Sequence, residues 1–213
     1  PEVEWCRRTD LLHEIEWYLR AESVAALLIE PIQSHYGDYY LDRDSLYQVR
    51  GICDKVNVPL IFDEIQTGFG TTGKMWYFQY LGIEPDMVCF GKKSQVSGIM
   101  VKEKFGKIFK SPLKLDVTWD GDLIDMVRCE YILKAYDKYN LLENARQRGS
   151  EFLNGLYDIK QIKNARGVGC LLAFDFDTHE EQESFAYRAF ENGLLFNKTR
   201  DKTIRFRPNL AVS

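Results

Sequence analysis

A carboxylate and a lysine each follow a short apolar segment of the chain. Asp63 comes directly after Pro59-Leu60-Ile61-Phe62, and Lys92 follows Met87-Val88-Cys89-Phe90 after a single glycine. Unbroken apolar segments are typical of strands buried in a parallel sheet, whose carboxyl ends meet at one edge. We therefore expect both side chains at that edge, where a lysine in a low-dielectric cleft can lose its proton and attack a carbonyl carbon.

These two side chains are the groups that pyridoxal phosphate chemistry needs. The amine forms a Schiff base with the cofactor, and the carboxylate keeps the pyridine nitrogen protonated so that the ring accepts electrons. The alternative is a surface aspartate and a solvated lysine at the starts of two loops. The spacing of Asp63 and Lys92 alone favours that alternative, so the surrounding sequence has to decide.

A glycine-rich segment between the two residues resembles a phosphate-binding P-loop. Residues 68–75 fit the pattern as far as Lys74, but Met75 stands where a serine or threonine must bind magnesium. The segment also begins only after the connection 64–67, which is longer than a phosphate cradle running directly from strand to helix. The motif therefore fails, and we expect no nucleotide hydrolysis.

The elements that must position Asp63 and Lys92 alternate along the first half of the chain. This alternation predicts an α/β fold, with a mainly parallel sheet flanked by helices and a ligand site outside the carboxyl ends of its strands. Hydrophobic spacing predicts helices over 8–20, about 46–56 behind the caps Asp42 or Asp44, and about 74–81 closed by Gly82, with buried strands over 24–29, 59–62 and 87–90.

A change in composition near residues 113–121 predicts a boundary between two domains, 1–120 and 121–213. The second is predicted to be a small α+β unit. Its expected elements are helices over about 123–136, 142–157 and 180–192, with strands over 171–176, 194–197 and 203–207.

The composition excludes several classes of protein. Of 213 residues, 45% are hydrophobic, so the chain can bury a core and is not disordered. Its net charge of -4 lacks the basic excess of a nucleic-acid binder, and its longest apolar run, 24–29, is too short to span a membrane. The five cysteines and three histidines are scattered, which favours a reduced, cytoplasmic protein with no metal site.

Four blocks around these residues resemble the class III aminotransferases, which are pyridoxal-phosphate enzymes of fold type I. Within that family, residues 90–96, 118–119 and 123–128 are most similar to the lysine epsilon-aminotransferases (L-lysine 6-transaminases), and the 4-aminobutyrate aminotransferases come second. The four blocks are Glu30-Pro31-Ile32-Gln33, residues 62–68 followed by Thr72-Gly73 and Trp76, Gly91-Lys92-Lys93, and Ile204-Arg205-Phe206-Arg207-Pro208.

The resemblance implies a role for each matching residue. Lys92 would carry the cofactor pyridoxal 5'-phosphate and move protons, Asp63 would pair with the pyridine nitrogen, and Gln66 would contact the ring hydroxyl. Thr118 would reach the cofactor phosphate of a second subunit, which implies a homodimer with shared active sites. Arg205 would hold a substrate carboxylate. The implied reaction moves the terminal amino group of L-lysine or a related omega-amino acid to 2-oxoglutarate.

Several features depart from the family pattern. His35 stands where the family usually has a glutamate that pairs with the arginine, and Asp120 and Asp122 add negative charge near the expected phosphate site. Family members are also about twice as long. The resemblance makes 1–120 the last part of the cofactor-binding large domain and 121–213 an incomplete small domain. A truncated relative that keeps the fold or a dimer surface without binding cofactor is therefore the alternative.

Overall fold

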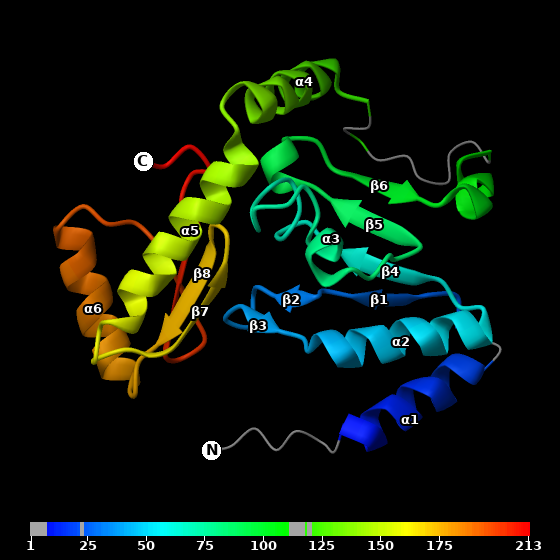
Figure 1. Cartoon of the computed structure of the whole chain (residues 1–213), viewed down its shortest axis with the longest axis horizontal. Helices are drawn as coiled ribbons and strands as arrows, with labels where there is room; N and C mark the ends of the chain where they lie inside the picture. The colour runs from blue at the N-terminus through cyan, green and yellow to red at the C-terminus, as the bar shows by residue number, and fades with distance from the viewer. Residues whose placement is uncertain (1–7, 22–23, 111–117, 119–120) are drawn as a thin grey trace.

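Three parallel strands bring Asp63 and Lys92 to one edge of a sheet. The structure, a computed structural model, describes residues 8–21, 24–110, 118 and 121–213. β1 (Leu27–Ile29), β4 (Leu60–Asp63) and β5 (Met87–Phe90) run parallel, and β6 (Gly98–Val101) pairs antiparallel with β5, in the order β1-β4-β5-β6 (Figure 1). Asp63 lies opposite Cys89 in the register of β4 and β5. The predicted α/β fold with a mainly parallel sheet is confirmed.

Three helices pack their apolar side chains with β4. They are α1 (Arg8–Arg20), α2 (Arg43–Val56) and α3 (Tyr77–Leu81). As predicted, Asp42 caps α2 by accepting a hydrogen bond from the Ser45 N–H at 2.8 Å, and Gly82 ends α3 with φ 69. β1 and α3 both begin three residues later than predicted, since apolar spacing places boundaries poorly. The shared core includes Leu19, Leu46, Val49, Ile52, Leu60, Phe62 and Leu81.

A short hairpin, absent from the sequence prediction, lies between β1 and α2. It consists of β2 (Ile32–Gln33) and β3 (Tyr39–Tyr40), with His35 in the connecting turn. Gly37 has φ 88 in this turn, and a Cβ there would lie 3.2 Å from Oγ1 of Thr203 in the second sheet. Glycine therefore allows the turn to approach that sheet closely.

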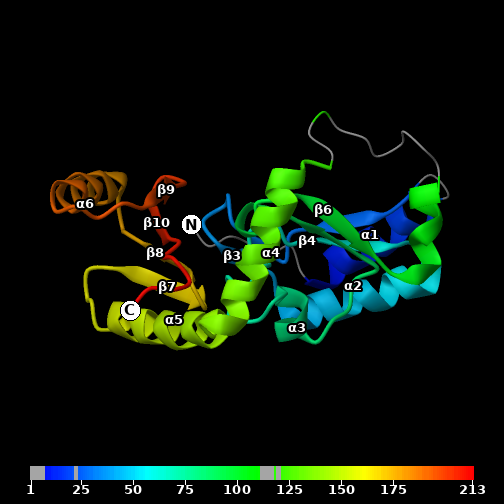
Figure 2. The same cartoon turned by 90° about the horizontal axis from the view of Figure 1, so that it is seen from above.

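The second sheet is antiparallel. It holds β7 (Lys163–Val168), β8 (Leu171–Asp175), β9 (Asn197–Thr199) and β10 (Thr203–Phe206) in the order β7-β8-β10-β9. α5 (Leu141–Tyr157) and α6 (His179–Glu191) pack against its strands, and α4 (Leu123–Lys138) precedes them (Figure 2). Sequence spacing missed β7 and placed β9 too early. The division of the chain near residue 121 stays a prediction.

The glycine-rich segment 68–73 is a buried packing element between the two sheets. The Cys170 N–H donates to the Thr71 carbonyl oxygen at 2.8 Å, and the Tyr136 hydroxyl donates to the carbonyl oxygen of Phe69. A Cβ on Gly70 would lie 2.6 Å from the Tyr136 ring. These glycines permit close packing, which agrees with the failed P-loop pattern.

Two short 3-10 helices complete the fold, namely Lys92–Ser94 and Glu103–Lys110. Within the described ranges, none of the helices has the length and apolar composition needed to cross a membrane.

Candidate active site

Lys92 leaves β5 through a strained turn. Gly91 separates it from the strand, and Lys92 itself has φ 54, in the left-handed region that costs a non-glycine residue about 1 kcal/mol. The backbone N–H and the side-chain amide of Gln95 both donate to the Lys92 carbonyl oxygen at 2.9 Å and hold this turn. Strained residues of this kind cluster at functional sites.

The Lys92 side chain is exposed, and its surroundings lower its pKa. Partial desolvation lowers the pKa of Lys92, the positive charge of Arg205 lowers it further, and the carboxylate of Asp63 acts in the opposite direction. Desolvation also lowers the pKa of Lys93, but the charges that act on Lys93 are those of Cys170 and Arg207. Asp63 is thus among the charges that act on Lys92, whereas the charge of Arg207 acts on both lysines.

Asp63 and Gln66 lie in the turn that follows β4. Asp63 is half-buried, and its Oδ1 accepts a hydrogen bond from the Ile65 N–H at 2.9 Å. Gln66 is half-buried too. Within the described ranges, Asp63 forms no ion pair and the Gln66 side chain makes no hydrogen bond, so their polar atoms remain available to a ligand.

Glu64, next to Asp63, has a structural role that the sequence did not suggest. Its side chain is buried and accepts hydrogen bonds from the N–H groups of Tyr77 and Phe78 at 2.6 and 2.8 Å, and from the Thr67 hydroxyl at 3.2 Å. Desolvation raises the pKa of Glu64. The carboxylate holds the start of α3 and is not available for chemistry.

The three residues expected near the cofactor phosphate differ in what the structure shows of them. Thr118 is exposed and makes no hydrogen bond to the part of the chain that the structure describes. Asp120 lies outside the described residues. Oδ1 of Asp122 accepts from the N–H groups of Ile124 and Asp125 at 2.8 and 3.2 Å, so this carboxylate caps α4.

Arg205 and His35 line the same cavity. Its volume is about 510 Å³, and its other lining residues are Tyr36, Lys198, Thr199 and Arg200. Arg205 Nη1 donates to the Ser34 carbonyl oxygen at 2.8 Å, while its buried Nε has no partner within the described ranges. Desolvation and the charge of Arg207 lower the pKa of Arg205, and the carboxylate of Asp38 acts in the opposite direction.

Side chains of the second sheet hold the turn that carries His35. The Thr199 hydroxyl donates to the carbonyl oxygen of His35, and Arg166 Nε donates to those of Gly37 and Asp38 at 3.1 and 3.2 Å. The fully buried carboxylate of Asp38 pairs with the guanidinium of Arg207. Sequence reasoning missed these contacts, because they join positions more than a hundred residues apart; the second arginine of the block 204–208 was their only local signal.

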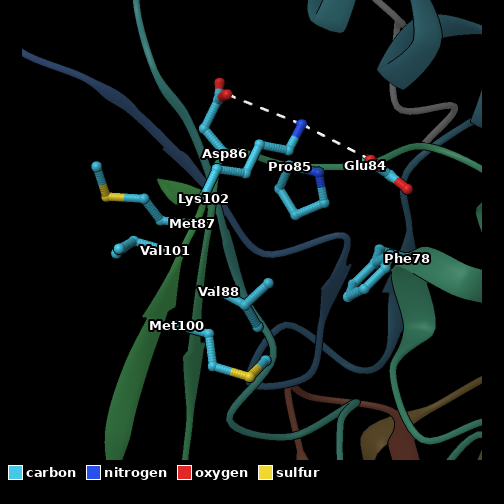
Figure 3. Close-up of a pocket in the computed structure, with 9 residues that line it drawn as sticks. All are labelled: Phe78, Glu84, Pro85, Asp86, Met87, Val88, Met100, Val101 and Lys102. Atoms are coloured by element: carbon cyan, nitrogen blue, oxygen red, sulfur yellow. Dashed lines mark ion pairs between the residues drawn. The ribbon is translucent and has the colours of Figure 1, made fainter. Parts of the chain in front are cut away.

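A second cavity lies at the opposite end of β5 from Lys92 and is not part of this site. Its volume is about 200 Å³, and Figure 3 shows Val88, Met100 and Phe78 around it. Lys102 Nζ lies 3.8 and 3.9 Å from carboxylate oxygens of Glu84 and Asp86. In the described part of the chain, no group of three or more histidine, cysteine or acidic side chains could hold a metal ion.

The donor set fits the ring end of pyridoxal phosphate. Asp63 offers a half-buried carboxylate without a cationic partner, and the Lys92 amine also lacks an ion-pair partner among the residues described. The unpartnered Nε of Arg205 supplies a guanidinium for a carboxylate substrate. For the phosphate, the predicted residues offer only the Thr118 hydroxyl.

Comparison with known proteins matches nearly the whole chain to one family. The sequence model of the family Aminotransferase class-III matches residues 4–213. L-lysine-epsilon aminotransferase of Mycobacterium tuberculosis is 35% identical over 203 residues, which cover 91% of this chain and 45% of that protein. A probable mitochondrial 4-aminobutyrate aminotransferase of Caenorhabditis elegans is 33% identical over 205 residues, covering 93% and 42%. The chain thus spans less than half the length of these curated relatives.

Solved structures give the same result. Lysine aminotransferase from M. tuberculosis in the internal aldimine form superposes with a TM-score of 0.90 at 33% identity, covering 97% of this chain and 50% of that one. Ornithine aminotransferase from Plasmodium yoelii superposes with a TM-score of 0.85 at 30% identity. The resemblance stated from the four sequence blocks is confirmed.

Proposed function

Because the chain belongs to the class III aminotransferases, whose cofactor is pyridoxal 5'-phosphate, we propose that it supplies the lysine-bearing half of an aminotransferase active site. The proposed reaction moves the terminal amino group of L-lysine or a related omega-amino acid to 2-oxoglutarate. Similarity to the lysine and 4-aminobutyrate aminotransferases supports this substrate class. The observation that carries the proposal is that β4 and β5 bring Asp63 and Lys92 to one edge of the sheet, where the charges of Asp63 and Arg205 act on the amine.

The proposed role of each residue is the one that the family resemblance implies, and the surroundings of Lys92 and Arg205 support it. When bound, pyridoxal phosphate supplies an electron sink that makes a proton on the substrate carbon labile. Lys92 Nζ, neutral at lower pH than an ordinary lysine, accepts and returns that proton. Asp63 would keep the ring nitrogen protonated, and Gln66 would bind the ring hydroxyl. Arg205 orients the substrate by its carboxylate.

The proposal extends to a homodimer in which Thr118 binds the cofactor phosphate of the second subunit. The exposed position of Thr118 supports this role. A cytoplasmic setting is also proposed, and it rests on the scattered cysteines, of which Cys53, Cys89, Cys129 and Cys170 are free thiols.

A non-catalytic relative is the second candidate, favoured by the departures from the family pattern at His35 and Asp120. An assay of transamination distinguishes the aminotransferase from the non-catalytic relative. The complete polypeptide that contains this chain, supplied with pyridoxal phosphate, lysine and 2-oxoglutarate, should form glutamate. Lys92→Ala should abolish that activity, while Lys93→Ala should keep at least a third of it. Absence of glutamate formation together with absence of cofactor binding would establish the non-catalytic relative.

A further inference from the structure

The cavity beside His35 has an unusual charge. Three of its six lining residues are permanent cations, namely Lys198, Arg200 and Arg205, and no carboxylate lines it. His35 occupies the position where the sequence pattern led us to expect a glutamate. The cavity therefore presents positive charge without a counter-charge in its wall, and its volume of about 510 Å³ suits a small ligand.

One of the three cations is already neutralised. Lys198 Nζ lies 2.6 Å from a carboxylate oxygen of Glu183 on α6. Arg205 and Arg200, in contrast, form no ion pair within the described ranges. The charge that the cavity offers to a ligand is thus that of two guanidinium groups.

Arg200 is held in place by local structure. It sits in the turn between β9 and β10 with φ 53, and its carbonyl oxygen accepts a hydrogen bond from Gln182 Nε2 at 3.4 Å. Its guanidinium carbon lies 5.2 Å from the centroid of the Tyr36 ring. A guanidinium against an aromatic face keeps the N–H donors at its edge free, and those donors bind carboxylates in pairs.

We propose that Arg200 is a second anion-binding residue of this cavity and that, with Arg205, it strengthens binding of the dicarboxylate acceptor and its product. The inference rests on the proposed function, which makes the ligand of this cavity a substrate. Two guanidinium groups without a carboxylate between them attract a molecule with two carboxylates and repel one whose corresponding end is an ammonium group. The acceptor 2-oxoglutarate and its product glutamate have this chemistry.

The test measures binding without turnover. In the complete polypeptide carrying Lys92→Ala, calorimetric titration with 2-oxoglutarate gives the dissociation constant. Addition of Arg200→Asn, chosen because asparagine tolerates a positive φ, should weaken binding about tenfold, the loss of one charge-assisted contact. Arg200→Lys should retain affinity within about threefold, because the charge remains. Lys202→Asn removes one positive charge at an exposed neighbouring position outside the cavity and should change affinity less than twofold.

Two results would overturn the proposal. Unchanged 2-oxoglutarate affinity in Arg200→Asn would show that the guanidinium does not face the ligand. Equally tight, Arg200-dependent binding of inorganic phosphate would show a general anion site rather than a dicarboxylate site. The binding measurement uses Lys92→Ala and therefore does not require transamination. If the protein without this substitution showed no transamination, the proposed function would be refuted, but the binding measurement would still test the role of Arg200.

Discussion

The carboxylate of Asp38, fully buried in the turn between β2 and β3, pairs with the guanidinium of Arg207, which directly follows β10. The two residues are 169 positions apart. Through this pair and the hydrogen bonds to the carbonyl oxygens of Ser34, His35 and Gly37, the second sheet fixes the turn that lines the basic cavity. The site beside Lys92 thus depends on the docking of both sheets.

Asp38→Ala should lower the free energy of unfolding by about 3 kcal/mol, because it leaves the partly buried guanidinium of Arg207 without its partner. The exposed pair of Glu130 and Lys134 provides the control, and Glu130→Gln should cost no more than about 0.5 kcal/mol. Urea unfolding of both variants measures the difference. Equal costs would show that the pair between Asp38 and Arg207 does not anchor the turn.

The low pKa of Asp86 predicts that the protein loses stability in acid. Desolvation raises the pKa of Asp86, but hydrogen bonds from Lys104, the Leu60 N–H and Arg50 outweigh it and hold the pKa at about 2. Because this value is lower in the folded than in the unfolded chain, the stabilisation is complete above about pH 4 and disappears as the pH falls toward 2. Asp86→Asn should therefore cost about 2 kcal/mol at pH 7 and progressively less below pH 4. A cost that stays constant between pH 7 and pH 3 contradicts this.

Removing the charge of Arg205 and removing that of Asp63 should shift the pKa of Lys92 in opposite directions. Arg205→Gln should raise it, since the charge of Arg205 lowers it, and Asp63→Asn should lower it further. Because folding lowers this pKa, the unfolded chain binds the proton to higher pH, and the contribution of Lys92 to stability rises as the pH increases through the folded-state pKa. The pH dependence of Lys92 acetylation in cofactor-free protein, followed by peptide mapping, gives the midpoints. If the pKa of Lys92 shifted in the same direction in both variants, the placement of Lys92 between the charges of Arg205 and Asp63 would be refuted.

His35→Glu should change the substrate preference, because it places a carboxylate on the cavity that Arg205 lines. We expect single-turnover rates to shift about tenfold toward lysine relative to glutamate, a difference of about 1.4 kcal/mol between the two transition states. His179→Glu, at an exposed histidine on α6 outside the cavity, is the control and should leave the ratio unchanged. If His35→Glu left the ratio of the lysine and glutamate rates unchanged, His35 would be only part of the turn and would not affect substrate preference.

Much of the fold could be predicted because buried strands and capped helices have local signals. The apolar run 87–90 predicted β5 with its observed bounds, and the cap Asp42 and the glycine at 82 marked helix ends. The strand ends in turn predicted that Asp63 and Lys92 share one edge. β2 and β3 were missed because two-residue strands show no periodicity, and β7 because half of its six residues are polar and do not alternate regularly with apolar ones.

The cavity itself could not be predicted, because its walls come from distant segments. His35 and Arg205 were named from separate sequence blocks, but Arg200 had no motif around it. Asp122 was named for its negative charge near the expected phosphate site, and the sequence did not indicate that it also caps α4. The roles of the cavity residues depend on contacts between segments far apart in the sequence, and the role of Asp122 depends on a local helix cap.

Lys92 is the residue proposed to carry the cofactor, and covalent labelling tests this assignment most directly. The complete polypeptide is incubated with pyridoxal phosphate, reduced with borohydride and digested for peptide mapping. We predict a single phosphopyridoxyl label on Lys92, lost in Lys92→Ala and retained in Lys93→Ala. A label on Lys93, or cofactor binding without any labelled lysine, would contradict it.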